Sequence, residues 1–160
     1  MRYIVDFFTN PVLLCAIFSW FLAQLLKLFT TPAHREIKSF IQYAFGSGGM
    51  PSSHAATVMA TCFSCGILYG FDSPYFAISA VVSMVVMKDA TGVRREAGKQ
   101  AEVINQVTRE LNKEHNKPTF EETLKELLGH TPLQVVAGAI LGIGMAFACQ
   151  LWLFRLMGIV

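Results

Sequence analysis

The sequence is poor in charge for its length. Only 15% of its 160 residues are Asp, Glu, Lys or Arg, and the formal net charge is +2. Nucleic-acid binding requires a concentrated basic surface, so no nucleic-acid partner is expected. The chain also has no internal repeat and no low-complexity tract, and its length suits a single domain over residues 1–160.

Cysteine is scarce as well, and the four cysteines lack the setting of a metal site. Cys62 and Cys65 form a C-x-x-C, but no second pair and no nearby histidine completes a zinc site. Cys15 and Cys149 lie in apolar stretches, as Cys62 and Cys65 do. We interpret all four as small residues that pack within helices. Neither a metal nor a cofactor is expected.

Long apolar runs dominate the sequence instead. The chain is 53% apolar, and its mean hydropathy is +0.45. A membrane span needs roughly 20 mostly apolar residues, and four blocks approach that length: 11–29, 54–71, 75–92 and 132–155. The first block is too long for a signal-peptide core, and no small-residue cleavage site follows it. The sequence therefore predicts an all-α integral-membrane bundle with four transmembrane helices; a soluble bundle of very apolar helices is the alternative.

Shorter helices are expected between the spans. Apolar residues recur at helical spacing in 35–45, which favours an amphipathic helix at the membrane interface. The polar stretch 94–115 also has helical periodicity. Thr119 and Glu122 have the spacing of a capping box, which would open a short helix that ends near Leu128.

The distribution of basic residues predicts the orientation in the membrane. We call the N-terminal side of the bundle side A and the opposite side, which the first span reaches, side B. Arg2 and Arg155 fall on side A, and the other eleven of the thirteen Lys and Arg residues fall on side B or at its boundary. Because cytoplasmic loops are enriched in Lys and Arg, we expect side B to be cytoplasmic. Four spans then place both termini outside the cytoplasm, in a multi-pass protein of the cell membrane.

Polar residues from every predicted span meet on side B. Polar groups at the edge of a span are costly and usually functional, so their convergence predicts a single site. The residues concerned are Lys27 at the end of the first span, Ser52, Ser53 and His54 at the start of the second, Asp89, Arg94, Arg95 and Lys99 at or after the end of the third, and His130 before the fourth.

The composition of this predicted site suits a phosphate group. A glycine-rich run, 46–49, leads into the second span, and the free N–H groups at a helix start favour an anion. Lys27, Arg94, Arg95 and Lys99 add positive charge, and arginine binds phosphate through two parallel hydrogen bonds. Taken alone, the glycines would equally suit a flexible loop with a serine N-cap. A cationic site under a membrane leaflet predicts a phosphorylated lipid or isoprenoid as the partner.

Two histidines beside a phosphate allow a division of labour. One imidazole can attack phosphorus and form a phosphohistidine, and the other can protonate the leaving alkoxide. Nearby cations would stabilise the charge on the remaining oxygens. His54 and His130 have this setting, whereas His34 and His115 do not, and we interpret the latter two as surface residues.

Three stretches resemble the type 2 phosphatidic acid phosphatase superfamily, which also contains vanadium-dependent haloperoxidases. They are GGMPSSHAA at 48–56, MKDATGVRREAGKQA at 87–101 and LKELLGHTPLQVVAGAILG at 124–142. More narrowly, the chain is similar to the divergent subfamily labelled acid phosphatase/vanadium-dependent haloperoxidase-related. The resemblance implies that His130 is the nucleophile, that His54 is the general acid and that hydrolysis needs no metal.

The chain departs from the superfamily motifs at several positions. Ser53 stands where the second motif has glycine. Leu124 and Gln134 occupy the arginine and aspartate positions of the third motif, and His34 occupies an arginine position of the first. Arg94 and Arg95 are the candidates to replace the missing arginines, with Lys125 as a weaker one.

Two of the candidate residues have alternative interpretations. Gln134 can orient the His130 ring, or it can be the capping-box partner of Thr131. Asp89 can supply the negative charge that Gln134 lacks, or it can pair with an arginine.

Four spans are fewer than the six typical of integral members of the superfamily, so a partner subunit can replace the missing helices. The small-residue pairs Gly66/Gly70 and Gly138/Gly142 permit close helix packing and a homodimer.

The sequence thus predicts an integral-membrane phosphohydrolase of a lipid or polyprenyl phosphate or pyrophosphate, acting through a phosphohistidine on the cytoplasmic side. The alternative is a non-catalytic protein that binds lipid phosphates or serves in membrane assembly. A vanadate-dependent haloperoxidase is a third hypothesis, and it rests on the family label alone.

Overall fold

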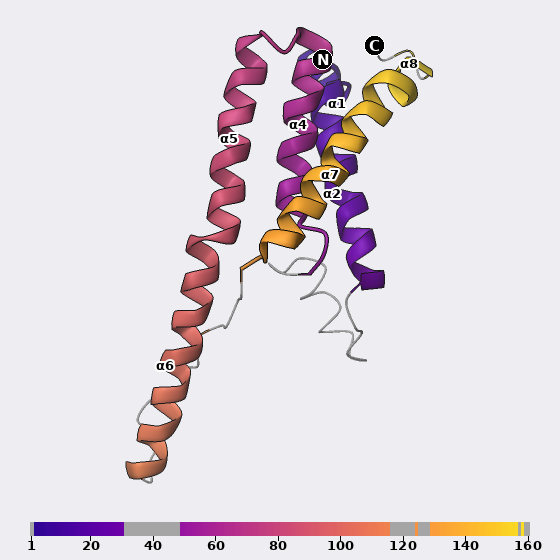
Figure 1. Ribbon diagram of the computed structural model, residues 1–160. Coiled ribbons are helices and arrows are strands. Elements are labelled where there is room, and N and C mark those ends of the chain that lie inside the picture. Colours follow the sequence, from indigo (N-terminus) through magenta and orange to yellow (C-terminus); the bar gives the residue numbers. More distant parts are fainter. Residues whose placement is uncertain (1, 31–48, 116–123, 125–128, 157, 159–160) are drawn as a thin grey trace.

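The protein is a bundle of helices whose long axes run side by side (Figure 1). The computed structural model describes residues 2–30, 49–115, 124, 129–156 and 158. Its elements are α1 Arg2–Phe8, α2 Pro11–Thr30, α4 Ser53–Tyr69, α5 Pro74–Thr91, α6 Val93–His115, α7 Pro132–Ala148, the π-helical turn η1 Cys149–Leu153 and α8 Phe154–Leu156. No strand occurs in these residues, which confirms the predicted all-α class.

Helix α4 lies at the centre of the bundle and contacts α2, α5 and α7. Three helical stretches are long and apolar enough to cross a membrane: Pro11–Thr30, Pro74–Lys113 and Pro132–Leu156. The fourth predicted span is α4, which has 17 residues and lies alongside the other three. The first three predicted spans coincide with α2, α4 and α5 to within two residues, and the fourth coincides with α7 together with η1 and α8.

The bundle has small residues inside and large apolar residues outside. Its buried positions include Cys15, Ala23, Ala56 and Ala60, all fully buried. Large side chains point outward instead, among them Phe21, Val85 and Ile140, with 61%, 64% and 66% of their surface exposed. A soluble protein rarely exposes apolar patches of this extent. In a bilayer the same surface is favourable, because lipid tails are as apolar as the side chains.

One of the two small-residue pairs mediates helix packing. A Cβ atom at Gly138 or Gly142 of α7 would collide with the backbone of α4, at Ser52 and at Ala56. These glycines therefore bring α7 against α4 within the chain, and their face is not free for a second copy. The other pair has different roles within the chain. Gly66 makes room for the ring of Phe71, which follows in the same chain, and Gly70 ends α4 with φ +94°.

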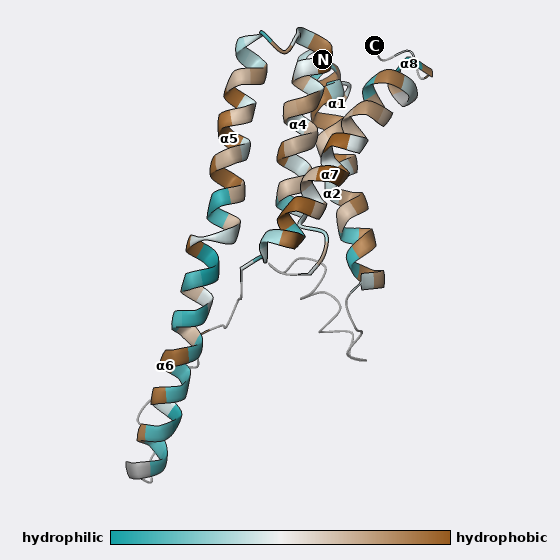
Figure 2. Cartoon of the chain, viewed as in Figure 1, coloured by the Kyte–Doolittle hydropathy of each residue, from teal (hydrophilic) through white to brown (hydrophobic). Residues whose placement is uncertain are grey.

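Helices α5 and α6 follow one another in nearly the same direction, so that α5 lies in the bundle and α6 projects from it as an arm (Figure 1). Helix α5 is largely apolar, whereas the arm is largely hydrophilic (Figure 2). Helix α6 confirms the polar helix predicted for 94–115. The helices predicted at 35–45 and at 119–128 fall outside the described residues, Leu124 excepted, so they stay predictions.

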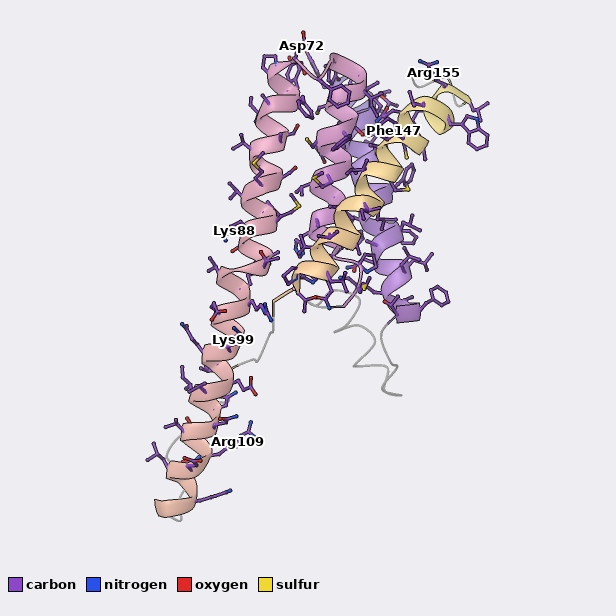
Figure 3. The ribbon with its side chains drawn as sticks, viewed as in Figure 1. Asp72, Lys88, Lys99, Arg109, Phe147 and Arg155 are labelled. Carbon is purple, nitrogen blue, oxygen red and sulfur yellow. The ribbon has the colours of Figure 1, made fainter. Side chains whose placement is uncertain are left out.

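The two ends of the bundle differ in character. Helices α1 and α8 lie at one end, together with the turn that contains Asp72 (Figures 1 and 3). The starts of α4 and α7 lie at the opposite end, where α5 passes into α6. We call this opposite end the histidine end, because His54 and His130 are located there. The predicted arrangement, with both termini on side A and the polar groups on side B, matches this topology.

Candidate functional site

The two candidate histidines meet at the histidine end. His54 is in the first turn of α4, which Ser52 caps by accepting a hydrogen bond from the Ala55 N–H at 3.4 Å. His130 directly precedes Thr131, the N-cap of α7. The centroids of the two imidazole rings are 6.2 Å apart, and the ring planes are inclined by 61°. Two residues 76 positions apart in sequence therefore face a common space.

Backbone hydrogen bonds fix the segments that present these rings. The Ser52 N–H donates to the Gln134 carbonyl oxygen at 2.9 Å, which joins the start of α4 to the first turn of α7. The His130 N–H donates to the Ala90 carbonyl oxygen at 3.1 Å, which joins His130 to the end of α5. A third bond runs from the Thr30 hydroxyl to the Met50 carbonyl oxygen and ties the end of α2 to the same region. All four main helices thus position the site.

The Gln134 side chain determines the tautomer of His130. Its Oε1 accepts from the Thr131 N–H at 3.0 Å and lies 3.3 Å from His130 Nδ1. An amide N–H can only donate, so the Gln134 atom that Thr131 contacts is the oxygen. Because an amide oxygen can only accept, Nδ1 carries the His130 proton and Nε2 keeps its lone pair. Both interpretations of Gln134 therefore hold at once: it closes the capping box, and it orients His130.

Lys27 brings a buried positive charge to the histidines. Only 4% of its surface is exposed, and its Nζ donates to Ser53 Oγ at 3.2 Å. Among the described residues, both ion pairs lie elsewhere, and no carboxylate is within 4.0 Å of this ammonium group. A buried ammonium needs a counter-charge to offset its desolvation. The site therefore favours an anion. Ser53, at the position where the motif has glycine, supplies the hydroxyl that holds Lys27.

Asp89 and the arginines lie at the edge of the site. Asp89 Oδ2 accepts from Arg94 Nε at 2.6 Å, so of its two interpretations the structure shows the pairing with an arginine. Arg94 is near enough to both rings to influence their protonation, and about half of its side chain is exposed. Arg95 is half-buried, and its backbone packs against Gly129, directly before His130.

Two positions named from the sequence are not part of this cluster. Lys99 lies on α6, away from the bundle (Figure 3), and its Nζ pairs with Glu96 Oε1 at 2.7 Å. Leu124, at the third motif's arginine position, is held against α6 through two hydrogen bonds between its backbone and the Asn105 side chain. Lys125, His34 and the run 46–48 fall outside the described residues.

The environment of His130 favours its neutral form. Burial lowers the pKa of the imidazole below its ordinary value of 6.5, and the charges of Lys27 and Arg94 lower it further, against the hydrogen bond from Nδ1 to Gln134. His130 is 2% exposed. Its Nε2 is buried without a hydrogen-bond partner in the described part of the chain. A neutral imidazole with a free Nε2 is the form that can act as a nucleophile.

The site contains groups that bind an anion but no metal-binding cluster. No three His, Cys, Asp or Glu side chains come together in the described ranges in a way that could hold a metal ion. The four cysteines are buried free thiols, as their apolar context predicted. Neither the Ser53–Lys27 contact nor the Ala90 carbonyl that holds His130 was predicted, because both depend on the packing of helices that are distant in sequence.

The fold and the site together define a class: a helical membrane protein with a cationic, two-histidine site at one end of its bundle. The chain belongs to the Divergent PAP2 family, which matches it over residues 8–145. A relative in Bacillus subtilis (strain 168), described as the uncharacterized membrane protein YuiD, is 36% identical over 150 residues, which cover 87% of this chain and 93% of the relative. No solved structure matches the chain.

Proposed function

We propose that the protein is an integral-membrane phosphohydrolase that cleaves a lipid or polyprenyl phosphate or pyrophosphate through a phosphohistidine on His130. The observation that supports this most strongly is the combination of two imidazoles 6.2 Å apart and a buried Lys27 ammonium that no carboxylate of the described residues approaches within 4.0 Å. A buried positive charge is stabilised by an anion, and a tetrahedral anion between the rings can contact both.

The first half of the proposed reaction transfers the phosphoryl group to the protein. His130 Nε2 attacks phosphorus, so a P–N bond forms while the P–O bond to the lipid breaks. The electron pair of the broken bond goes to the leaving oxygen, which takes a proton from the His54 imidazolium. Lys27, Arg94, Arg95 and the N–H groups at the start of α4 stabilise the charge on the other oxygens.

The second half regenerates the protein with water. His54, now neutral, takes a proton from water as the water oxygen attacks phosphorus. The P–N bond breaks, inorganic phosphate leaves, and His130 recovers its lone pair. Gln134 accepts the Nδ1–H bond throughout, so the same tautomer returns for the next cycle.

We further propose that the histidine end faces the cytoplasm, because the order of the spans in the sequence assigns eleven of the thirteen Lys and Arg residues to that side or its boundary. The substrate would then reside in the inner leaflet.

Trapping of the covalent intermediate tests the proposal. Protein purified in detergent is mixed for a short time with lipid phosphates labelled at phosphorus, in the presence of EDTA, and then digested. We expect an acid-labile phosphopeptide that contains His130, and release of phosphate at a rate that EDTA leaves unchanged. His130→Ala should reduce turnover on the order of 10³-fold or more, whereas His115→Ala on α6 should retain it. Full turnover in His130→Ala would contradict the proposal.

A second function, phosphate binding without turnover, is favoured by one observation. Gln134 is uncharged, so it cannot stabilise a positive charge on His130 as the motif's aspartate would. Tight binding of vanadate, with no phosphate released from any lipid phosphate in the panel, would select this alternative.

A further inference from the structure

A groove runs along the outside of the bundle between α4 and α5. Part of it is a cleft of about 380 Å³, a volume within the range of small-molecule sites. Its walls are lined by Val58, Thr61 and Cys65 of α4 and by Tyr75, Ile78, Ser79, Val82 and Ser83 of α5.

The groove offers a largely apolar surface, although four of its lining residues carry a hydroxyl group: Thr61, Tyr75, Ser79 and Ser83. Thr61 donates to the Thr57 carbonyl oxygen at 2.9 Å, and Ser79 donates to that of Tyr75 at 2.7 Å. The Ser83 hydroxyl lies 2.7 Å from the Ser79 carbonyl oxygen and 3.0 Å from that of Val58. The hydroxyl hydrogens of Thr61, Ser79 and Ser83 are therefore used by the backbone. The fourth hydroxyl belongs to Tyr75 in the first turn of α5, at the end of the groove away from the histidines. The walls suit an apolar occupant.

The groove lies on the same face of α4 as the candidate site. His54, Val58, Thr61 and Cys65 are spaced by four, three and four residues, so they share one face of α4. At 1.5 Å per residue, Val58 lies about 6 Å and Cys65 about 16 Å along the axis from His54. The latter distance is close to half of the roughly 30 Å hydrocarbon core of a bilayer. A chain attached at the histidine end would thus follow the groove through one leaflet.

A second cleft adjoins the groove and lies between α4 and α2, where Val12, Leu13 and Ala16 form its other wall. It has a volume of about 450 Å³, shares Thr61, Cys65 and Tyr75 with the first, and reaches Asn10 and Tyr69.

We propose that the groove between α4 and α5 binds one hydrocarbon chain of the lipid phosphate whose phosphate lies between His54 and His130. This inference rests on the phosphate site of the proposed function, and it names the substrate class as a phosphate attached to a long acyl or prenyl chain. The groove is bounded by only two neighbouring helices, α4 and α5, and we expect it to accept one chain, so a second chain of the same lipid would stay in the bilayer. The groove lies on the face of α4 that carries His54, as a chain attached to a phosphate at His54 requires. A helix of a second copy would require no such alignment, so the groove favours a substrate chain over a second copy.

Photolabelling with a ligand that cannot be hydrolysed tests the groove independently of turnover. The probe is a single-chain alkyl phosphonate with a diazirine near the middle of its chain, added to the protein in lipid nanodiscs and mapped by mass spectrometry. We expect adducts on the peptides that contain Thr61, Cys65 and Ser79. We also expect excess unlabelled phosphonate to suppress them, because they arise at a specific site. An alkyl diazirine alcohol should label the outer surfaces of all spans instead.

Matched variants on α5 sharpen the test. Val82 lines the groove, whereas Val85 is 64% exposed and lines neither cleft. Val82→Phe should reduce specific labelling at least fivefold, and Val85→Phe should leave it within twofold of the wild type. Equal labelling of the two variants, or adducts spread evenly over α2 and α7, would overturn the proposal. Adducts that join two copies through the groove would also overturn it.

Groove labelling and phosphate release are measured separately, so the groove and the hydrolase activity can fail independently. Groove labelling in a protein that hydrolyses no phosphate would support the groove and contradict the hydrolase. Hydrolysis of long-chain phosphates with no groove labelling would support the hydrolase and contradict the groove.

Discussion

At the scale of single residues, the site depends on which side chains accept hydrogen bonds from two buried groups, the ammonium of Lys27 and the imidazole of His130. Ser53 accepts from Lys27, and Gln134 accepts from His130 and Thr131. The sequence predicted that these residues would gather at one face, because each stands at the end of a span. It left Gln134 with two alternative roles, since only coordinates show that one oxygen reaches both partners. The pairing of Asp89 with Arg94 was likewise one of two alternatives.

The charge of Lys27 should be measurable through His130. Replacing Lys27 by Met removes a cation that disfavours the imidazolium, so the pKa of His130 should rise. The neutral nucleophile then becomes scarcer on the acidic side, and the acidic limb of kcat/KM should move to higher pH. NMR titration of the His130 ring measures the pKa shift without requiring turnover.

Lys99→Met is the matched control, because Lys99 lies on α6 and pairs with Glu96. It should leave the His130 titration unchanged. An unshifted His130 in Lys27→Met would mean that no ammonium charge acts on the ring.

At the scale of helices, the separation of the histidines is set by the contact between α4 and α7. This contact is close because Gly138 and Gly142 have no side chain to hold the backbones apart. The G-x-x-x-G spacing predicted the close packing of α7, whereas within the chain Gly66 makes room for the Phe71 ring and Gly70 ends α4. Apolar run length predicted the four spans well. Run length gave no indication of the short helix α1. It also gave no indication of the near-straight junction between α5 and α6, because that junction depends on the backbone geometry at Gly92.

Substitution of Gly138 should disturb the site without touching a candidate functional side chain. The Cβ atom of Gly138→Ala would meet the Ser52 carbonyl group, so α7 must move away from α4. We expect a loss of about 1–3 kcal/mol in stability and at least tenfold lower turnover, since the Ser52 N–H bond to Gln134 would lengthen. Thermal unfolding in detergent and phosphate release measure the two effects.

Gly144→Ala provides the comparison on the same helix. Its Cβ atom would meet no atom of the described residues within 4 Å, so the change should be neutral or should stabilise α7 by up to about 1 kcal/mol. If both variants behaved alike, the close approach at Gly138 would not govern the site.

At the scale of the whole molecule, the topology places the site opposite the chain's ends. An even number of spans puts α1 and α8 at one end and the start of α4 and of α7 at the other. This count was sufficient to predict, from the sequence alone, that all the candidate residues share one side. Lys99 shares that side but lies along the arm, because α6 continues the direction of α5 out of the bundle. The sequence did not predict that continuation.

Chemical labelling in intact cells tests the proposed orientation. In a variant without native cysteines, Asp72→Cys in the turn between α4 and α5 should react with a membrane-impermeant maleimide added outside. Gln106→Cys on α6 should react only after lysis, because eleven of the thirteen basic residues predict a cytoplasmic location for that end. The reverse labelling pattern would place the histidine end outside the cytoplasm.

The central claim is that His54, His130 and Lys27 surround one tetrahedral anion. An experimental structure of the protein soaked with tungstate tests it most directly, because the heavy metal atom of the anion is located by its anomalous scattering. The account predicts one tungstate between the two imidazole rings, within hydrogen-bond distance of the Lys27 ammonium, and its absence in Lys27→Met. A well-ordered wild-type structure with no tungstate between the rings, or with the anion bound at another place in the bundle, would contradict it.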